Sequence, residues 1–309
     1  MLFRKIKSYL HLQGNIVDSV NGYSLVLVAR TINGIRFHQK YEELSAIALS
    51  ESRPGVSNER IGSSEIIVSL TTHGKRLYDV HATIESIMRG SVKPNRIVLW
   101  VSEDYRNIVL PLTLQKQTER GLEIRYCKDI RSYTKLVPAL KDYPEASIIT
   151  IDDDIIYPYD LLECLINAHE EYPDCICANW IREIPLNLDK KYISMMKWPQ
   201  LFEANDVSKR FFFEGFAGVL YPPHSLDPEV LNEAVFLDIC KYADDVWFNA
   251  MALKAGTKVK YAWNHYTLSS FINNEDAQCV ALQHINSEGE VLNDVQIKSV
   301  YGKYGLWPK

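Results

Sequence analysis

Hydrophobic and polar positions alternate along the chain from about residue 65 in segments that suit strands and helices in turn. Almost continuous apolar runs predict buried strands, and amphipathic patterns between them predict helices. Alternation of this kind is typical of a parallel sheet with helices on both faces, so the predicted fold class is α/β, Rossmann-like. The predicted strands are Ile66–Leu70, Arg96–Val101, Leu122–Tyr126 and Ile148–Ile151, and the predicted helices are Val80–Met88 and Leu136–Leu140.

The second half of the chain continues this pattern with one long interruption. We expect a helix over Leu161–His169, a strand over Ile176–Trp180 and a helix over Val246–Lys254 that ends at Gly256. Residues 182–212 lack clear periodicity and contain several aromatic side chains. These aromatics could stack on a sugar ring or line the core.

The first 60 residues differ from the rest. Residues 50–64 are rich in Ser, Gly, Pro, Asn and Glu, which is typical of a linker and predicts a boundary near residue 60. The expected domains are therefore an appendage over residues 1–60 and the α/β domain over residues 61–309. Residues 1–12 form an amphipathic segment with three basic residues, which could contact an anionic membrane surface or pack on its own domain.

Composition and charge limit the class of protein. The chain has 309 residues, of which 47% are hydrophobic and 24% charged, as in an ordinary globular protein. Its net charge of −5 does not favour nucleic acid as a partner, and no apolar run is long enough to span a membrane. The six cysteines show no paired zinc spacing. We therefore expect reduced thiols in a cytoplasmic protein, with or without a peripheral contact to the inner face of the membrane.

Three consecutive carboxylates end the fourth predicted strand. Asp152, Asp153 and Asp154 follow the apolar run directly, at the carboxyl edge of the sheet, where open α/β folds bind their ligands. Like charges this close repel one another, and a hard divalent cation with oxygen ligands would neutralise them. The plainer alternative is a turn, or a cap for the helix after Pro158. The pattern favours a metal and phosphate site.

Two cations, a threonine and a glycine are further candidates for this edge. The loop after the first strand runs from Thr71 to Arg76, and its backbone amides and Arg76 could hold a base or a phosphate. Lys135 lies just before the strand that bears the aspartates and would supply positive charge. Gly218 precedes a later strand and permits close approach of the backbone to a ligand. The alternatives are solvated surface side chains for the cations and a bulge for the glycine.

Asp244 and Asp245 form a second acidic pair, at the start of a predicted helix. Capping of the helix, worth ~1 kcal/mol, explains one of them. The second needs another reason. A carboxylate held at a helix N-terminus and aimed into a metal site is a credible general base for deprotonating an alcohol.

Taken together and in this order, these motifs resemble those of bacterial GT-A fold glycosyltransferases, the kind encoded with capsule, O-antigen and other surface polysaccharides. The likeness runs from about residue 65 to about residue 296. It is carried by Ile67–Thr72 with Arg76, Lys135 within Tyr-Thr-Lys-Leu, Asp152–Asp154 followed by Tyr157 and Pro158, Gly218 within Gly-Val-Leu-Tyr-Pro-Pro, Asp244 and Asp245 within Ala-Asp-Asp-Val-Trp, and Asn293–Gln296.

The resemblance implies a role for each matching residue in donor and metal binding. Asp152 and Asp154 match the ends of the Asp-X-Asp motif, which in the family binds Mn²⁺ or Mg²⁺ together with the nucleotide diphosphate and ribose. The residues expected to bind the nucleotide sugar are Thr71, Arg76, Lys135, Asp152, Asp153 and Gly218.

The resemblance also assigns the chemistry of transfer. Asp245 matches the acidic residue that acts as catalytic base in inverting members, with Asp244 as the fallback. Members often take a further metal ligand, commonly His, from the C-terminal part. His265 and His284 are the candidates, although neither lies in a matched motif.

The expected function is metal-dependent transfer of a sugar from a nucleotide sugar, such as a UDP-hexose or UDP-N-acetylhexosamine, to a hydroxyl of a glycan or lipid-linked acceptor. A phosphohydrolase of the haloacid dehalogenase type also uses Asp-X-Asp after a strand. In that class the Lys follows the motif, whereas Lys135 precedes Asp152. A non-catalytic module that binds sugar nucleotides or glycans is the third alternative.

Overall fold

The computed structural model describes residues 28–307 apart from residues 29, 61, 63, 263 and 275–291. Two predicted features, the amphipathic segment over residues 1–12 and the candidate ligand His284, lie outside the described residues. The centre of the fold is an eight-stranded sheet with the order β3-β2-β1-β4-β11-β6-β12-β9. Its strands are β1 Ile66–Thr71, β2 Arg96–Ser102, β3 Leu122–Cys127, β4 Ser147–Thr150, β6 Ile176–Ala178, β9 Val207–Ser208, β11 Val219–Tyr221 and β12 Val259–Tyr261.

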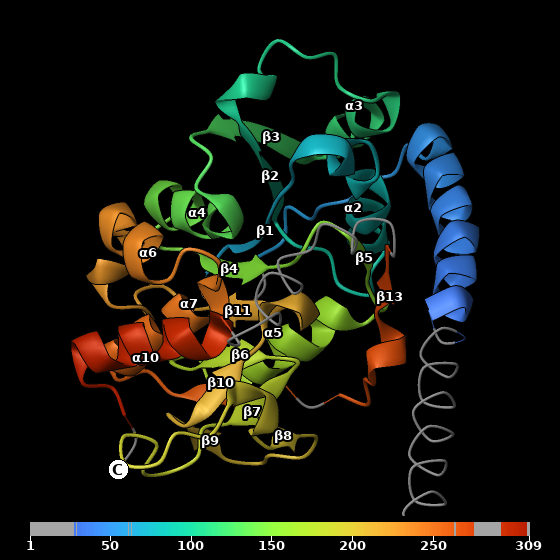
Figure 1. Ribbon diagram of the computed structural model, residues 1–309. Helices are drawn as coiled ribbons and strands as arrows, with labels where there is room; N and C mark the ends of the chain where they lie inside the picture. Colours follow the sequence, from blue (N-terminus) through green and yellow to red (C-terminus); the bar gives the residue numbers. More distant parts are fainter. Residues whose placement is uncertain are drawn as a thin grey trace, which may run out of the picture.

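Helices cover both faces of this sheet (Figure 1). Successive strand residues point to opposite faces. Val68 of β1 therefore belongs to the core cluster that includes residues of α2, α3 and α5, and its neighbour Ile67 belongs to the cluster that includes residues of α4, α7 and α10. Both side chains are fully buried. The helices are α2 Val80–Met88, α3 Leu112–Thr118, α4 Val137–Asp142, α5 Leu161–Glu171, α6 Glu233–Ile239, α7 Asp244–Ala255 and α10 Leu292–Tyr304.

The predicted fold class is confirmed. Strands β1 to β4 pair in parallel, as do β6 and β12. Two strands depart from the expected parallel pattern, because β11 runs antiparallel to both β4 and β6, and β9 runs antiparallel to β12. The reversal of β11 matters for function, since the segment that leads into it starts at the edge where β4 ends.

The segment over residues 182–212 is more ordered than its sequence pattern indicates. It contains parts of four very short strands, β7 Ile181–Glu183, β8 Gln200–Leu201, β9 and β10 Phe211–Phe213. Most of its aromatic residues line the core, including Trp198, Phe211 and Phe212. Phe202 is the exception among them, with 58% of its surface exposed.

A helix over residues 30–50 packs along the outside of the α/β body (Figure 1). Phe37 and Leu44 on its inner side are buried against residues of α2, β5 Ile155–Ile156 and β13 Ile272–Asn273. Ala48 on the same side is also buried. Residues 51–60 follow without regular helix or strand, as the composition predicts. No helix in the described ranges has the length and apolar character needed to cross a membrane.

Candidate active site

The residues predicted to form the site gather at the carboxyl edge of the sheet. Parallel pairing of β1 with β4 sets Ser69 opposite Thr150, so Thr71 and Asp152 lie at the same level of this edge. Antiparallel pairing of β11 with β4 brings the 3-10 helix η5, Gly215–Ala217, to the same place. The amino end of α7 completes the edge. We call Asp152, Asp153, Asp154, Asp244 and Asp245 the acidic cluster.

Lys135 joins the two parts of the acidic cluster. Its ammonium lies 2.8 Å from Asp152 Oδ1 and 3.1 Å from Asp244 Oδ2, and its side chain is buried. Burial alone would lower the pKa of Lys135, but the neighbouring carboxylates, Asp152 foremost, raise it well above its ordinary value. The lysine is therefore held as a cation between β4 and α7.

The backbone of Lys135 is fixed by the sheet. Ser69 Oγ of β1 donates to the Lys135 carbonyl at 2.6 Å and accepts from the indole of Trp100 in β2 at 2.9 Å. Two strands thus position the end of the 3-10 helix η3, Arg131–Lys135, from which the lysine reaches the acidic cluster.

Arg76 approaches the cluster from the other side. Its Nη1 lies 2.9 Å from Asp153 Oδ1 and 3.4 Å from Asp154 Oδ2. Burial and the charges of Asp153 and Asp152 raise the pKa of Asp154 to about 7, and burial raises that of Asp153. The single guanidinium of Arg76 therefore faces two carboxylates, those of Asp153 and Asp154, at this end of β4.

Asp245 is held by the backbone of η5. The Gly215 N–H donates to Asp245 Oδ2 at 2.9 Å, whereas Oδ1 has no hydrogen-bond partner among the described residues. Burial and the adjacent Asp244 raise the pKa of Asp245 to about 8, although Lys135 opposes this shift. A carboxylate with one anchored oxygen and one unpartnered oxygen has the arrangement that a general base requires.

The expectation that one aspartate caps α7 is wrong. Helix α7 already begins at Asp244, its N-cap residue is Ala243, and no side chain caps it. Asp244 faces Lys135 and Asp245 faces Gly215, so both carboxylates serve the cluster. Their place in the first turn is still favourable, because the amino end of a helix carries partial positive charge.

Gly215, which the sequence did not single out, lies closer to the cluster than Gly218 does. A Cβ on Gly215 would fall 2.6 Å from Asp245 Oδ1 and 3.2 Å from Lys135 Nζ. Gly218 has a φ of +88°, and a Cβ there would meet Leu165 and Leu161 of α5 instead. Position 218 therefore requires glycine because of its backbone conformation, and position 215 requires glycine because a side chain there would collide with the site.

Thr71 and Tyr157 complete the edge. Thr71 Oγ1 donates to the Trp100 carbonyl at 3.0 Å, which fixes the end of β1. The buried Tyr157 hydroxyl accepts from the Asp152 N–H at 2.9 Å and donates to the Phe216 carbonyl at 2.8 Å. Tyr157 thereby connects the turn that carries the aspartates to η5. In the sequence, the only indication of this role is that Tyr157 follows the motif closely.

The donor chemistry of the cluster fits a hard divalent cation, because five carboxylates face two cationic side chains. Burial, and after it the charges of Asp153 and Asp152, raises the pKa of Asp154 to about 7. Within the described ranges, no three His, Cys, Asp or Glu side chains are arranged as metal ligands. His265 is exposed, and no contact of it with the cluster is present.

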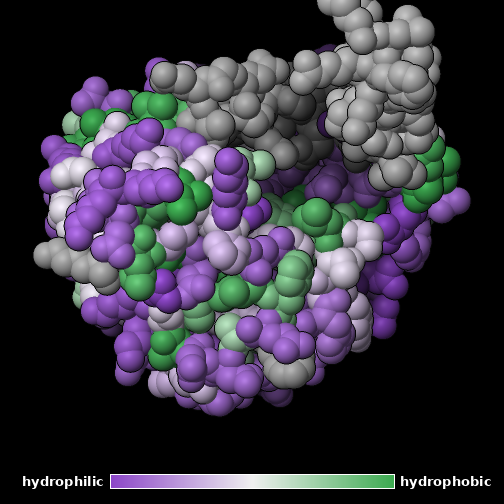
Figure 2. All heavy atoms as spheres, turned by 60° about the horizontal axis from the view of Figure 1, so that its bottom comes forward, coloured by the Kyte–Doolittle hydropathy of each residue, from purple (hydrophilic) through white to green (hydrophobic). Residues whose placement is uncertain are grey.

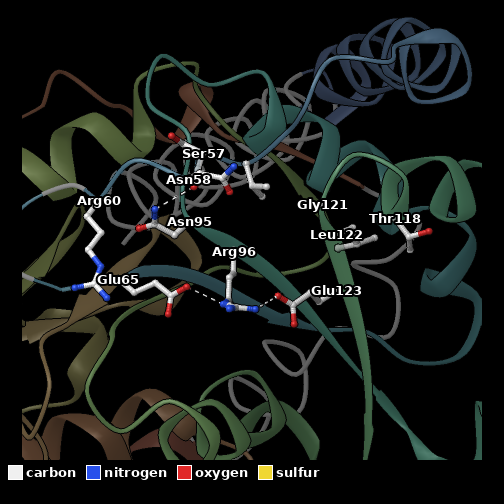
Figure 3. A pocket seen from close by; sticks show the side chains of 11 residues that line it. Ser57, Asn58, Arg60, Glu65, Asn95, Arg96, Thr118, Gly121, Leu122 and Glu123 are labelled. Carbon is white, nitrogen blue, oxygen red and sulfur yellow. Dashed lines mark hydrogen bonds and ion pairs between the residues drawn. The ribbon is translucent and has the colours of Figure 1, made fainter.

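A cavity of about 550 Å³ lies at the opposite, amino edge of the sheet (Figure 3). Arg96 stands in it between two glutamates, 2.7 Å from Glu65 and 2.5 Å from Glu123. These charges sit at the starts of β1, β2 and β3. Arg125 also pairs with Glu123, at 3.0 Å, so the two glutamates face two arginines. The cavity is separate from the acidic cluster.

No family model matches the sequence, and no curated protein matches it. Among solved structures, the chain is similar to a 4-diphosphocytidyl-2C-methyl-D-erythritol synthase from Anaerococcus prevotii, with TM-score 0.44 and 17% identity over 74% of this chain and 100% of that one. A CMP:2-keto-3-deoxy-manno-octonic acid synthetase complexed with CTP gives TM-score 0.43 and 10% identity over 73% and 100%. The chain is also similar to a mannosyltransferase from Pyrobaculum calidifontis in complex with GDP-Man and Mn²⁺. Here the TM-score is 0.40 and the sequence identity 12%, over 77% of this chain and 64% of that one. Identities and TM-scores this low do not transfer an activity to this chain.

Proposed function

We propose that this chain is a metal-dependent glycosyltransferase of the GT-A type, which moves a sugar from a nucleotide sugar to a hydroxyl of a glycan or lipid-linked acceptor. One observation carries the proposal. The carboxylates of the Asp-X-Asp motif, two cations and the candidate base meet at the carboxyl edge of the sheet, although 93 residues separate Asp152 from Asp245 in the chain.

Donor binding is assigned to the residues that surround β4. Arg76 and Lys135 would exchange part of their contacts with the aspartates for the donor diphosphate, for which both are suited. Asp152 and Asp154 would hold Mn²⁺ or Mg²⁺, which when bound supplies compensation for the charge that develops on the leaving nucleoside diphosphate. Thr71 and Asp153 lie at the same edge and keep their proposed place beside the nucleotide.

Asp245 is the proposed base. The acceptor hydroxyl would lie against Asp245 Oδ1 and lose its proton to that atom as its oxygen attacks the anomeric carbon. The bond between that carbon and the phosphate oxygen then breaks, and the electron pair leaves with the nucleoside diphosphate. Gly215 keeps the other carboxylate oxygen in place through its N–H, at 2.9 Å from Oδ2. A pKa near 8 makes Asp245 a stronger base than an ordinary aspartate.

A panel of nucleotide sugars tests the proposal, starting with UDP-hexoses and UDP-N-acetylhexosamines. Thermal stabilisation and metal-dependent release of nucleoside diphosphate by one donor are the expected results, and both should disappear in Asp154→Asn. Hydrolysis of p-nitrophenyl phosphate without response to any nucleotide sugar would instead assign the chain to the phosphohydrolases. Binding of a donor without turnover would leave a binding module.

A further inference from the structure

The helix over residues 30–50 is fixed to the body by hydrogen bonds as well as by burial of Phe37 and Leu44 (Figure 1). Burial alone does not define where a helix packs, because apolar contact has no direction. The face of the body shown in Figure 2 carries further hydrophobic residues, scattered among hydrophilic ones. The polar contacts of the helix therefore show best what its position does for the rest of the molecule.

One of these contacts holds the strand β13. Asn33 Nδ2 donates to the Asn273 carbonyl at 3.0 Å. Strand β13 pairs with β5, which begins directly after Asp154. Beyond the paired residues, the Asn274 N–H donates to the Asp154 carbonyl at 2.8 Å. The helix thus holds the segment that holds the backbone of a proposed metal ligand.

Tyr41 supplies a second connection, through Asp79. The Tyr41 hydroxyl donates to Asp79 Oδ1 at 3.2 Å, and Asn274 Nδ2 donates to Asp79 Oδ2 at 3.5 Å. Burial, and after it the charge of Asp79, raises the pKa of Tyr41 to about 12, so the hydroxyl stays a donor at neutral pH. Asp79 directly follows the 3-10 helix η1, Gly74–Tyr78, and its N–H donates to the Arg76 carbonyl at 3.0 Å. One carboxylate thereby contacts the outer helix, the segment after β13 and the turn that carries the arginine of the site.

We propose that the helix over residues 30–50 is a working part of the donor site, with Tyr41 as a positioning residue that acts through Asp79 and Asn274. We call these three residues the clamp. The clamp holds the backbone of Asp154 and of Arg76, so its loss should loosen both and weaken metal binding, because partners that orient a metal ligand contribute to affinity. The effect on metal binding rests on the proposed function, whereas the effect on the backbone is independent of it.

Hydrogen exchange on the full chain without any ligand tests the effect on the backbone. Tyr41→Phe removes the hydroxyl that bonds to Asp79 and leaves the ring in place. We expect the amides of residues 152–157 and 272–274 to exchange about three- to tenfold faster, the range that loss of one hydrogen bond gives. Asn33→Ala should accelerate exchange in the same two segments.

The matched control is Tyr304→Phe. Tyr304 is also half-buried, and its hydroxyl also bonds to a carboxylate, Glu229 Oε1 at 3.0 Å, which is not part of the clamp or of the acidic cluster. Thermal melting should show Tyr41→Phe and Tyr304→Phe folded with similar midpoints. Only Tyr41→Phe should change exchange in residues 152–157.

Calorimetric titration with Mn²⁺, alone and with UDP present, tests the effect on metal binding. A direct partner of a metal ligand typically contributes 10- to 100-fold to affinity, and Tyr41 acts through further residues, so Tyr41→Phe should weaken Mn²⁺ binding by about three- to tenfold. Tyr304→Phe should bind Mn²⁺ like the wild type.

Three results would overturn the proposal: wild-type exchange in residues 152–157 of both Tyr41→Phe and Asn33→Ala, equal acceleration there by Tyr304→Phe, or unchanged Mn²⁺ affinity in Tyr41→Phe. Failure of the wild type to bind Mn²⁺ in either titration would instead remove the metal role of the acidic cluster from the proposed function. Hydrogen exchange would then still decide whether the clamp holds the backbone of Asp154.

Discussion

Replacing Gly215 with alanine should disable the site while leaving the protein folded. The new Cβ would fall 2.6 Å from Asp245 Oδ1, whereas ordinary contact begins at 3.4 Å, so the carboxylate must move by about 0.8 Å. The new Cβ would also lie 3.2 Å from Lys135 Nζ, so it cannot shift toward the lysine to relieve the contact with Asp245. The substituted residue therefore acts directly on the proposed base.

The expected magnitude follows from that displacement. A misplacement of about 1 Å in a catalytic group can cost on the order of 10²-fold in rate. We therefore expect kcat to fall by roughly 30- to 100-fold in Gly215→Ala. The donor KM should change less, because the new Cβ approaches Asp245 more closely than it approaches Lys135, which is one of the proposed donor-binding residues. Strain on the Gly215–Asp245 hydrogen bond should cost about 1–2 kcal/mol of stability.

Two other glycines serve as controls for this assay, which measures nucleoside diphosphate release with the donor found in the panel. Gly302→Ala in α10 meets nothing within 4 Å and should keep full activity with a gain of ~0.5–1 kcal/mol in stability. Gly218→Ala should lose stability, because its φ of +88° is strained for alanine. Wild-type kcat in Gly215→Ala would refute the placement of Asp245 as the base.

Three further predictions concern the charges. Asp245→Asn should abolish transfer and keep donor binding, which calorimetry measures. The kcat of the wild type should rise with pH through about 8 as the Asp245 carboxyl ionises, and a flat pH profile would contradict this. Because the folded-state pKa of Asp245 exceeds its ordinary unfolded value, the carboxyl costs stability as pH rises toward 8, so Asp245→Asn should gain stability relative to wild type over that range. Asp154→Asn should abolish metal-dependent turnover, and EDTA should do the same to the wild type; turnover that survives either would remove the metal role. Lys135→Met should destabilise the fold by about 3 kcal/mol in urea titrations, because Asp244 loses its partner, whereas Lys128→Met on the surface should cost less than ~0.5 kcal/mol.

Local patterns in the sequence were sufficient to predict the framework of this fold. The strands β1, β2 and β4 are buried on both faces, so each appears as a nearly continuous apolar run. The strand β3 lies at the edge of the sheet, is only half-buried after Leu122 and alternates apolar with charged residues. Helix α2 was located to the residue, because its boundaries coincide with the limits of an amphipathic pattern. The segments β7 to β10 were not predicted, since strands of two or three residues are too short to carry a periodicity.

The site was predictable in its residues but not in their mutual contacts. Lys135 is expected near Asp152 because a phosphate site at the edge of a sheet needs positive charge. The bridge from Lys135 to Asp244 depends on the antiparallel course of β11 and on where α7 begins, and neither is visible in local pattern. For the same reason the sequence did not distinguish Gly215, which touches the base, from Gly218, which satisfies a backbone turn.

The most direct test of the central claim is anomalous diffraction from crystals that hold Mn²⁺ and the nucleoside diphosphate of the active donor. We expect a manganese peak in contact with Asp152 and Asp154, with the diphosphate beside Arg76 and Lys135. A peak elsewhere in the protein, or a nucleotide bound away from the carboxyl edge of β4 while those aspartates keep their ion pairs, would contradict it.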